Sequence, residues 1–201
     1  MSVEKNLDEY VIKPLMQVMG KKAERIYYTD IGDAGEVITD GKGIDIIAHQ
    51  VILGFENNNS LFVSWTGRVP GWEQYAISAS IASYVIPDAG ISNTFAVQSK
   101  YWEIIIGKRL TGVSVYGFKE YKFTRMSCET GESTEIVYHN QPHLFIFYFE
   151  DSQVTMANFY LATDFQPKIP IGDDIWIIFD ANRRDQFIEK LELEKLHRLC
   201  T

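Results

Sequence analysis

Leu144-Phe145-Ile146-Phe147-Tyr148-Phe149 is apolar at every position, and this stretch decides the fold. A strand with one face in water alternates apolar and polar side chains. An unbroken apolar run therefore predicts a central strand that is covered on both faces, most simply by a helix on one side. The polar turn Glu150 to Gln153 separates this run from a second strand-forming run, Val154 to Tyr160. Together these features predict a hairpin at the centre of a sheet.

Further strand signals lie on both sides of this hairpin. Residues 46–55 and 60–65 are rich in β-branched and aromatic residues, and they flank Glu56-Asn57-Asn58-Asn59. Asparagine tolerates the left-handed backbone conformation, so this segment predicts a second hairpin turn. Residues 112–118 and 175–179 predict one strand each.

Helical patterns occur in three segments. In residues 6–19 apolar side chains recur three and four positions apart, and Gly20 follows as a C-terminal cap. Residues 180–199 show the same period and predict a C-terminal helix. Residues 72–85 contain no glycine or proline and predict another helix.

These elements predict the fold class. We expect a single α+β domain over residues 1–201, in which a bent, largely antiparallel β-sheet packs against the C-terminal helix and one or two other helices. The chain has 201 residues, of which 46% are hydrophobic, and this is enough for one sizeable core.

Charge and composition exclude several classes of protein. The net charge of -8 argues against a nucleic-acid-binding domain, because such domains collect basic residues against the phosphates. An acidic surface suits a basic protein partner instead. The chain has no apolar run of about 18 residues, so no membrane span is expected. The first residues lack the features of a signal peptide, and the two cysteines do not form a disulfide framework, so we expect a cytoplasmic protein.

The chain carries no motif that predicts catalysis, a metal or a cofactor. His139 and His143 are four residues apart, but Gln141 and Pro142 between them argue against a helical metal-binding pair. Cys128 lies in a polar turn without the signature of a nucleophile. The glycines of residues 32–43 do not form a phosphate-binding pattern, and no nucleophile elbow occurs.

Candidate binding residues come from loops and turns. Trp72 follows Val69-Pro70-Gly71 in a loop context, where it is either an exposed interface anchor or simply packed in the core. Acidic residues gather at the two hairpin turns and before the last apolar strand. The candidate protein-binding residues are therefore Trp72, Glu56, Glu150, Asp151, Asp173 and Asp174.

One family resemblance covers roughly residues 100 to 180. The segment Trp102 to Lys108 is followed by a strand, and then Gln141-Pro142-His143-Leu144-Phe145-Ile146-Phe147 runs into Glu150-Asp151 and another strand. This order resembles small immunity-type proteins of bacterial toxin systems. The resemblance implies a cytoplasmic α+β domain that plugs the active site of a toxin, and it assigns no functional residue. Acidic groups would steer such a domain toward a cationic cleft.

The leading hypothesis is a non-enzymatic protein-binding domain, with an immunity protein that occludes a toxin as its specific form. One alternative is a small-molecule-binding domain or hydrolase with a pocket in the bent sheet, lined by residues such as Trp65, Tyr148 and Trp176. Another is a structural or self-associating subunit that uses a sheet edge or an exposed apolar patch. The sequence leaves the partner and the oligomeric state open.

Overall fold

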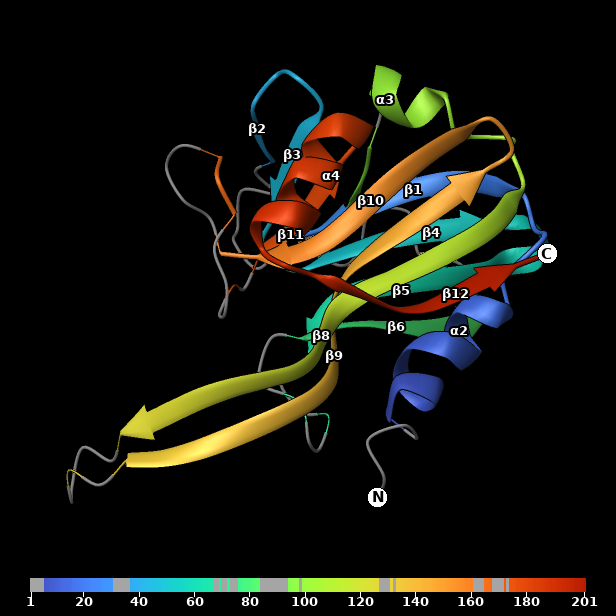
Figure 1. The fold of residues 1–201 in the computed structure, drawn as a ribbon. Coiled ribbons are helices and arrows are strands. Elements are labelled where there is room, and N and C mark those ends of the chain that lie inside the picture. Colours follow the sequence, from blue (N-terminus) through green and yellow to red (C-terminus); the bar gives the residue numbers. More distant parts are fainter. Residues whose placement is uncertain are drawn as a thin grey trace.

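The computed structural model describes residues 6–30, 37–66, 69, 72, 76–83, 94–97, 99–126, 131, 133–160, 165–167, 172 and 174–201. Within these residues the strands form two antiparallel sheets, one of five strands and one of seven (Figure 1). The expected α+β class with mostly antiparallel sheet is confirmed. The strands divide between two sheets that pack face to face, instead of forming one bent sheet.

The five-stranded sheet has the order β6-β5-β4-β1-β7. Each neighbouring pair in it is antiparallel. Its strands are β1 (Ala23–Thr29), β4 (Gln50–Phe55), β5 (Asn59–Thr66), β6 (Ala76–Ser83) and β7 (Thr94–Ala96).

The seven-stranded sheet has the order β12-β8-β9-β10-β11-β3-β2. Its strands are β2 (Ile38–Thr39), β3 (Ile44–Ile47), β8 (Leu110–Met126), β9 (Ser133–Phe149), β10 (Ser152–Phe159), β11 (Asp174–Ile178) and β12 (Glu194–Cys200). The helical elements are η1 (Asp8–Ile12), α2 (Lys13–Met16), η2 (Glu56–Asn58), α3 (Lys100–Glu103) and α4 (Ala181–Lys190). None of the described helices is long and apolar enough to span a bilayer.

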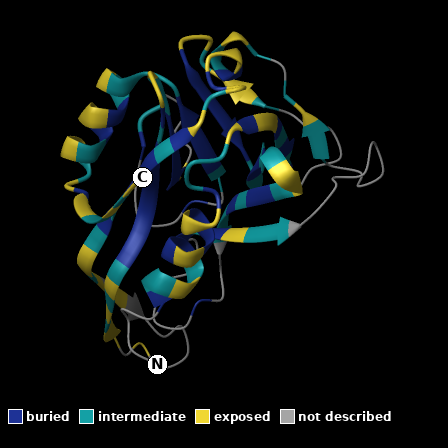
Figure 2. Ribbon diagram, turned by 90° about the vertical axis from the view of Figure 1, so that its right-hand side faces the viewer, coloured by how far each residue is buried: buried dark blue, intermediate teal, exposed yellow. Residues whose placement is uncertain are grey.

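The strands β9, β10, β11 and β3 of the seven-stranded sheet are buried on both faces (Figure 2). Phe145 and Phe147 of β9 point into the core between the two sheets. Leu144 and Ile146 of the same strand point the other way and join a second cluster with Phe187 of α4. The prediction of a central strand with a helix on one side is therefore confirmed.

The two expected hairpins are present, and the first differs in one respect. Asn57 and Asn58 adopt positive φ in the turn between β4 and β5, as asparagine permits. The run expected as the first strand is divided: residues 44–47 belong to the seven-stranded sheet, and residues 50–55 belong to the five-stranded sheet. The chain therefore crosses between the sheets at Ala48 and His49.

The prediction of one helix over residues 180–199 is wrong in its second half. Helix α4 ends at Lys190, and Glu192 follows with φ of 53°. The strand β12 then pairs with the first part of β8. The helical spacing of the leucines was misleading, because the edge of β8 supplies hydrogen bonds that local propensity does not reveal.

The prediction of a helix over residues 72–85 is also wrong. Residues 76–83 form the edge strand β6, in which apolar residues alternate with smaller polar ones. Ile77 and Ala79 point into the core between the sheets. The alanines suggested a helix. The isoleucines and serines, however, alternate with a period of two residues, which is typical of a strand with one buried face.

A buried hydrogen-bond chain joins the two sheets. Tyr28 of β1 donates its hydroxyl proton to Oδ2 of Asp45 in β3 at 3.0 Å, and Trp102 of α3 donates its indole proton to the same hydroxyl at 2.7 Å. Tyr28 is 0% exposed and Trp102 is 1% exposed. Burial raises the pKa of Tyr28 and the pKa of Asp45. The hydroxyl of Tyr28 therefore satisfies two polar groups that water reaches poorly.

We expect Tyr28→Phe to lower the free energy of unfolding by about 1–3 kcal/mol, because the indole N–H of Trp102 loses its partner and Asp45 loses a donor. Urea unfolding followed by tryptophan fluorescence would measure this loss. Tyr27→Phe, at the next and more exposed position of the same strand, is the matched control. Equal losses in the two variants would contradict the role of the buried hydroxyl.

Candidate protein-binding site

The strands β8 and β9 are longer than the other strands of their sheet, so their hairpin extends past those strands. β12 pairs with β8 only as far as Gly117, and β10 pairs with β9 only from Leu144 onward. Past these residues, in the part of the chain that the structure describes, the ladder continues between β8 and β9 alone. Residues 118–126 and 133–140 form this two-stranded arm, which projects from one end of the body (Figure 1).

A change of register bends the hairpin where the arm leaves the body. Tyr116 pairs with Leu144, but the next residue, Gly117, pairs with Pro142, so β9 carries one extra residue here. A Cβ atom at Gly117 would lie 1.9 Å from the carbonyl oxygen of Gln141. Glycine is therefore required at this close approach. Such a bulge bends the strands and increases their twist, which sets the direction of the arm.

The two faces of the arm differ in chemistry. Tyr121 pairs with Tyr138, and Ile136 lies two positions along on the same face. These three side chains are half-buried and form what we call the apolar arm face. The opposite, charged arm face consists of exposed side chains: Glu120, Lys122, Thr124, Glu135, Val137 and His139.

The apolar arm face begins at an aromatic contact with the body. Phe118 packs against the cluster under α4 and stacks on Tyr121, with the ring centroids 5.2 Å apart. From there the arm extends past the ends of the strands of the five-stranded sheet (Figure 1). The arm thus carries half-buried aromatic side chains away from the body.

Buried polar residues lie at the base of the arm. His143 is 1% exposed and Gln141 is 0% exposed. The side-chain nitrogens Nε2 of both residues are 3.2 Å apart, which fits an amide N–H of Gln141 donating to the imidazole. Burial lowers the pKa of His143 to about 4, so the ring is neutral at physiological pH.

This pKa gives the protein a defined pH dependence. In the unfolded chain the pKa of His143 has its ordinary value of about 6.5, so the unfolded chain takes up a proton more readily than the folded protein. The stability is therefore full above about pH 6.5 and falls toward pH 4. We expect His143 to lower the free energy of unfolding by about 2 kcal/mol between pH 7 and pH 5. Urea unfolding at both pH values measures it, with His143→Gln as the non-titrating comparison. An unchanged pH dependence in that variant would contradict the assignment.

The acidic residues predicted for binding lie at the other end of the β8–β9 hairpin. Glu56 pairs with the guanidinium of Arg109 at 3.1 Å, and Glu150 accepts a hydrogen bond from the backbone N–H of Arg109 at 3.3 Å. Asp151 forms an ion pair with Lys108, and its hydrogen bond with that ammonium lowers its pKa. The structure therefore brings three of the predicted acids together, but beside two cations that offset their charge.

The other predicted residues are placed differently. Trp72 is 6% exposed and packs edge-on against Tyr10 at a ring distance of 6.4 Å, so the expectation of an exposed tryptophan is corrected. Its burial follows from the apolar core that the N-terminal helical segment shares with it. Asp174 is half-buried and opens β11, where it pairs with Phe159. Asp173 lies outside the described residues.

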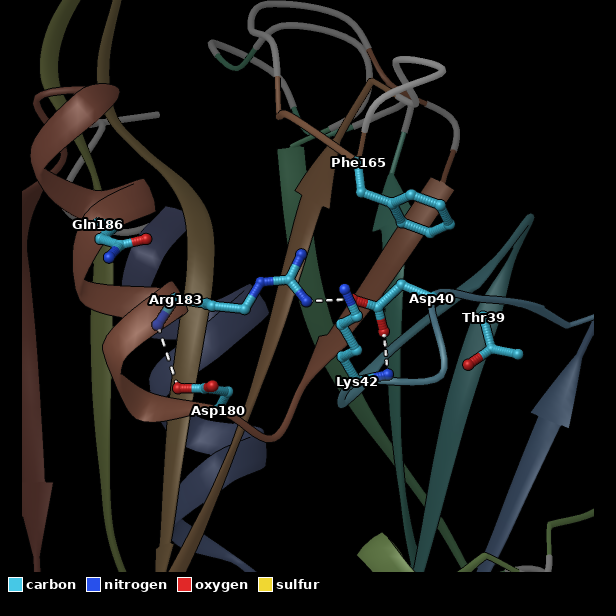
Figure 3. A pocket seen from close by; sticks show the side chains of 7 residues that line it. All are labelled: Thr39, Asp40, Lys42, Phe165, Asp180, Arg183 and Gln186. Atoms are coloured by element: carbon cyan, nitrogen blue, oxygen red, sulfur yellow. Dashed lines mark hydrogen bonds and ion pairs between the residues drawn. The ribbon is translucent and has the colours of Figure 1, made fainter.

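A polar cleft of about 700 Å³ lies between the turn that joins β2 and β3 and the first turns of α4 (Figure 3). The guanidinium of Arg183 reaches across this cleft toward Asp40 (Figure 3). The lining residues are Thr39, Asp40, Lys42, Phe165, Asp180, Arg183 and Gln186.

The carboxylates of this cleft serve the fold. Asp40 accepts hydrogen bonds from the backbone N–H groups of Lys42 and Ile44 at 2.8 and 2.9 Å and forms an ion pair with Arg183. Although partial burial acts in the opposite direction, these bonds lower the pKa of Asp40. Asp180 caps α4 by accepting from two backbone N–H groups at 2.8 and 3.3 Å. Both carboxylates therefore hold the backbone around the cleft.

Among the described residues, no group of three histidine, cysteine or acidic side chains could hold a metal ion. The three aromatics proposed to line a pocket do not meet: Trp65 lies in the five-stranded sheet, and Trp176 is buried in the cluster under α4. Tyr148 lies in β9 and packs at the border of that cluster.

No family model, no curated protein and no solved structure matches this chain. The choice of function therefore depends on the geometry of the molecule.

Proposed function

We propose that this protein is a non-enzymatic protein-binding domain and that it contacts its partner with the β8–β9 arm. The observation that supports this proposal is the apolar arm face, which carries Tyr121, Ile136 and Tyr138 past the ends of the five-stranded sheet. An isolated two-stranded ribbon is marginally stable in water. A partner that buries this face would stabilise the arm and gain affinity from aromatic contact area.

The chemistry of the arm indicates the kind of partner. The outer edges of its two strands carry backbone groups that can pair with an added strand, and its apolar face fits a hydrophobic groove. On the charged arm face Lys122 lies within 4 Å of both Glu120 and Glu135 and offsets part of their negative charge. We therefore expect a partner with an apolar groove or an extended segment, and binding that weakens little as salt rises.

An immunity protein remains the specific form of this proposal. A narrow projecting ribbon has a suitable shape to enter and occlude the cleft of a toxin, and the resemblance of residues 100 to 180 includes both strands of the arm. The acidic residues Glu56, Glu150 and Asp151 would contribute less than their number suggests, because Lys108 and Arg109 lie beside them. A reducing cytoplasm is the expected location, and the free, exposed Cys200 fits it.

Site-specific photo-crosslinking in the native host would test the proposal. A photoreactive phenylalanine at position 136 or 138 should trap one protein in a stoichiometric band, because both positions lie on the apolar arm face. The same group at Tyr160, which is 52% exposed on the body, is the matched control. Mass spectrometry of the band identifies the partner.

Substitutions separate the two faces of the arm. The pair Ile136→Ser and Tyr138→Ser should reduce capture of that partner by at least tenfold, whereas the pair Lys122→Ser and Glu135→Ser should leave it within about threefold. Circular dichroism checks that each variant keeps its sheets. Crosslinks that form only at position 160, or equal losses for the two pairs, would overturn the role of the arm.

A further inference from the structure

The four edges of the two sheets are protected unequally. β2 has two residues and β7 has three, so each offers little backbone for pairing. β12 carries Glu194, Lys195 and Arg198 and is irregular between Lys195 and His197. Short edges, charges and bulges are the usual devices that prevent sheets from joining. The fourth edge, β6, has eight residues, none of them charged and none of them proline.

The surroundings of β6 leave one of its edges for pairing. β5 pairs with it along its whole length on one side. The nearby η1 and α2 insert Val11 and Leu15 into the same core cluster as Ile77 and Ala79, so they pack against its inward face. No described strand pairs with its other edge, and β6 is the outermost strand of its sheet. Ser80 on its outward face is exposed.

The sequence of β6 reads the same in both directions. Residues 76–82 are Ala-Ile-Ser-Ala-Ser-Ile-Ala, with Ala79 at the centre. If two copies of this strand run antiparallel about a two-fold axis at Ala79, then Ile77 lies opposite Ile81 of the other copy, and Ser78 lies opposite Ser80. The two isoleucines share the inward face, and the two serines share the outward face. Matched apolar pairs and serine pairs are favourable across antiparallel strands.

We infer that β6 is a dimerisation edge, where two copies of this chain join their five-stranded sheets through antiparallel pairing centred on Ala79. A self-complementary strand is what an isologous two-fold interface requires, because a residue that meets a second residue of the other copy is itself met by that second residue's counterpart in its own copy. The result is a continuous sheet of ten strands, five from each copy. This inference rests on β6 alone and does not depend on the function proposed for the arm.

The dimer should depend on concentration. A single pair of strands buries less than the roughly 1,600 Å² of a standard stable interface. Sedimentation velocity over a series of concentrations should therefore show the wild-type protein changing from monomer to dimer. A wild-type protein that stays monomeric at the highest soluble concentration would overturn the inference.

Charge substitutions test the edge and its register together. The double variant Ser78→Lys and Ser80→Lys places lysines opposite lysines in the dimer, and we expect it to weaken dimerisation by at least tenfold. The double variant Ser78→Asp and Ser80→Asp should do the same. When the two variants are mixed, each new lysine faces a new aspartate, so a heterodimer should form.

Controls separate loss of pairing from loss of folding. Ser133→Lys on the arm adds a lysine away from β6 and should leave the dimer unchanged. Thermal unfolding at a concentration where all proteins are monomeric shows whether the variants keep their fold, and recovery of the heterodimer on mixing gives a second check. A dimer that both charged variants retain would show that the contact lies elsewhere and would overturn the inference.

Discussion

The long antiparallel ladder between β8 and β9 is the interaction on which the rest of this structure depends. Its two strands have 17 residues each, and in the body both of its faces are buried. One face supplies Phe145 and Phe147 to the core between the sheets, and the other supplies Leu144 and Ile146 to the cluster under α4. A strand shared by two cores couples them, because a change in its register would expose apolar residues on both sides.

The same ladder explains how a projecting arm can be held in position. An isolated ribbon would twist and fray, but here its two strands are fixed at their base by the body and by the bulge at Gly117. Phe118 stacks on Tyr121 at 5.2 Å and meets the ring of His143 at 5.3 Å, so aromatic contacts continue from the buried base into the arm. The arm therefore has a defined direction relative to the body.

The sequence was informative where one local signal determined the structure. Six consecutive apolar residues at 144–149 predicted a strand buried on both faces, and Asn57 and Asn58 predicted a tight turn. It failed where a neighbouring strand decided the outcome. Residues 194–200 became a strand because β8 offers them a partner, and residues 76–83 became a strand because β5 does.

The candidate site was harder to predict for the same physical reason. The residues of the arm were not singled out, because its length depends on where β12 and β10 stop pairing with it, and this is a property of the sheet. One signal was present: Tyr121 and Tyr138 stand in two alternating segments with charged residues between apolar ones. The acids at Glu56, Glu150 and Asp151 were found from their turns, but their pairing with Lys108 and Arg109 needed the folded structure.

Polar side chains fix the elements of the body. Asp45 is held by Tyr28, Asp40 by Arg183, and the carboxylate of Asp180 caps α4. The first two contacts each join one element to another, so they hold the sheets and α4 in place. The apolar arm face and the edge of β6 are strand surfaces at the border of this framework. We propose that contact with another polypeptide completes the packing of the first and the hydrogen bonds of the second.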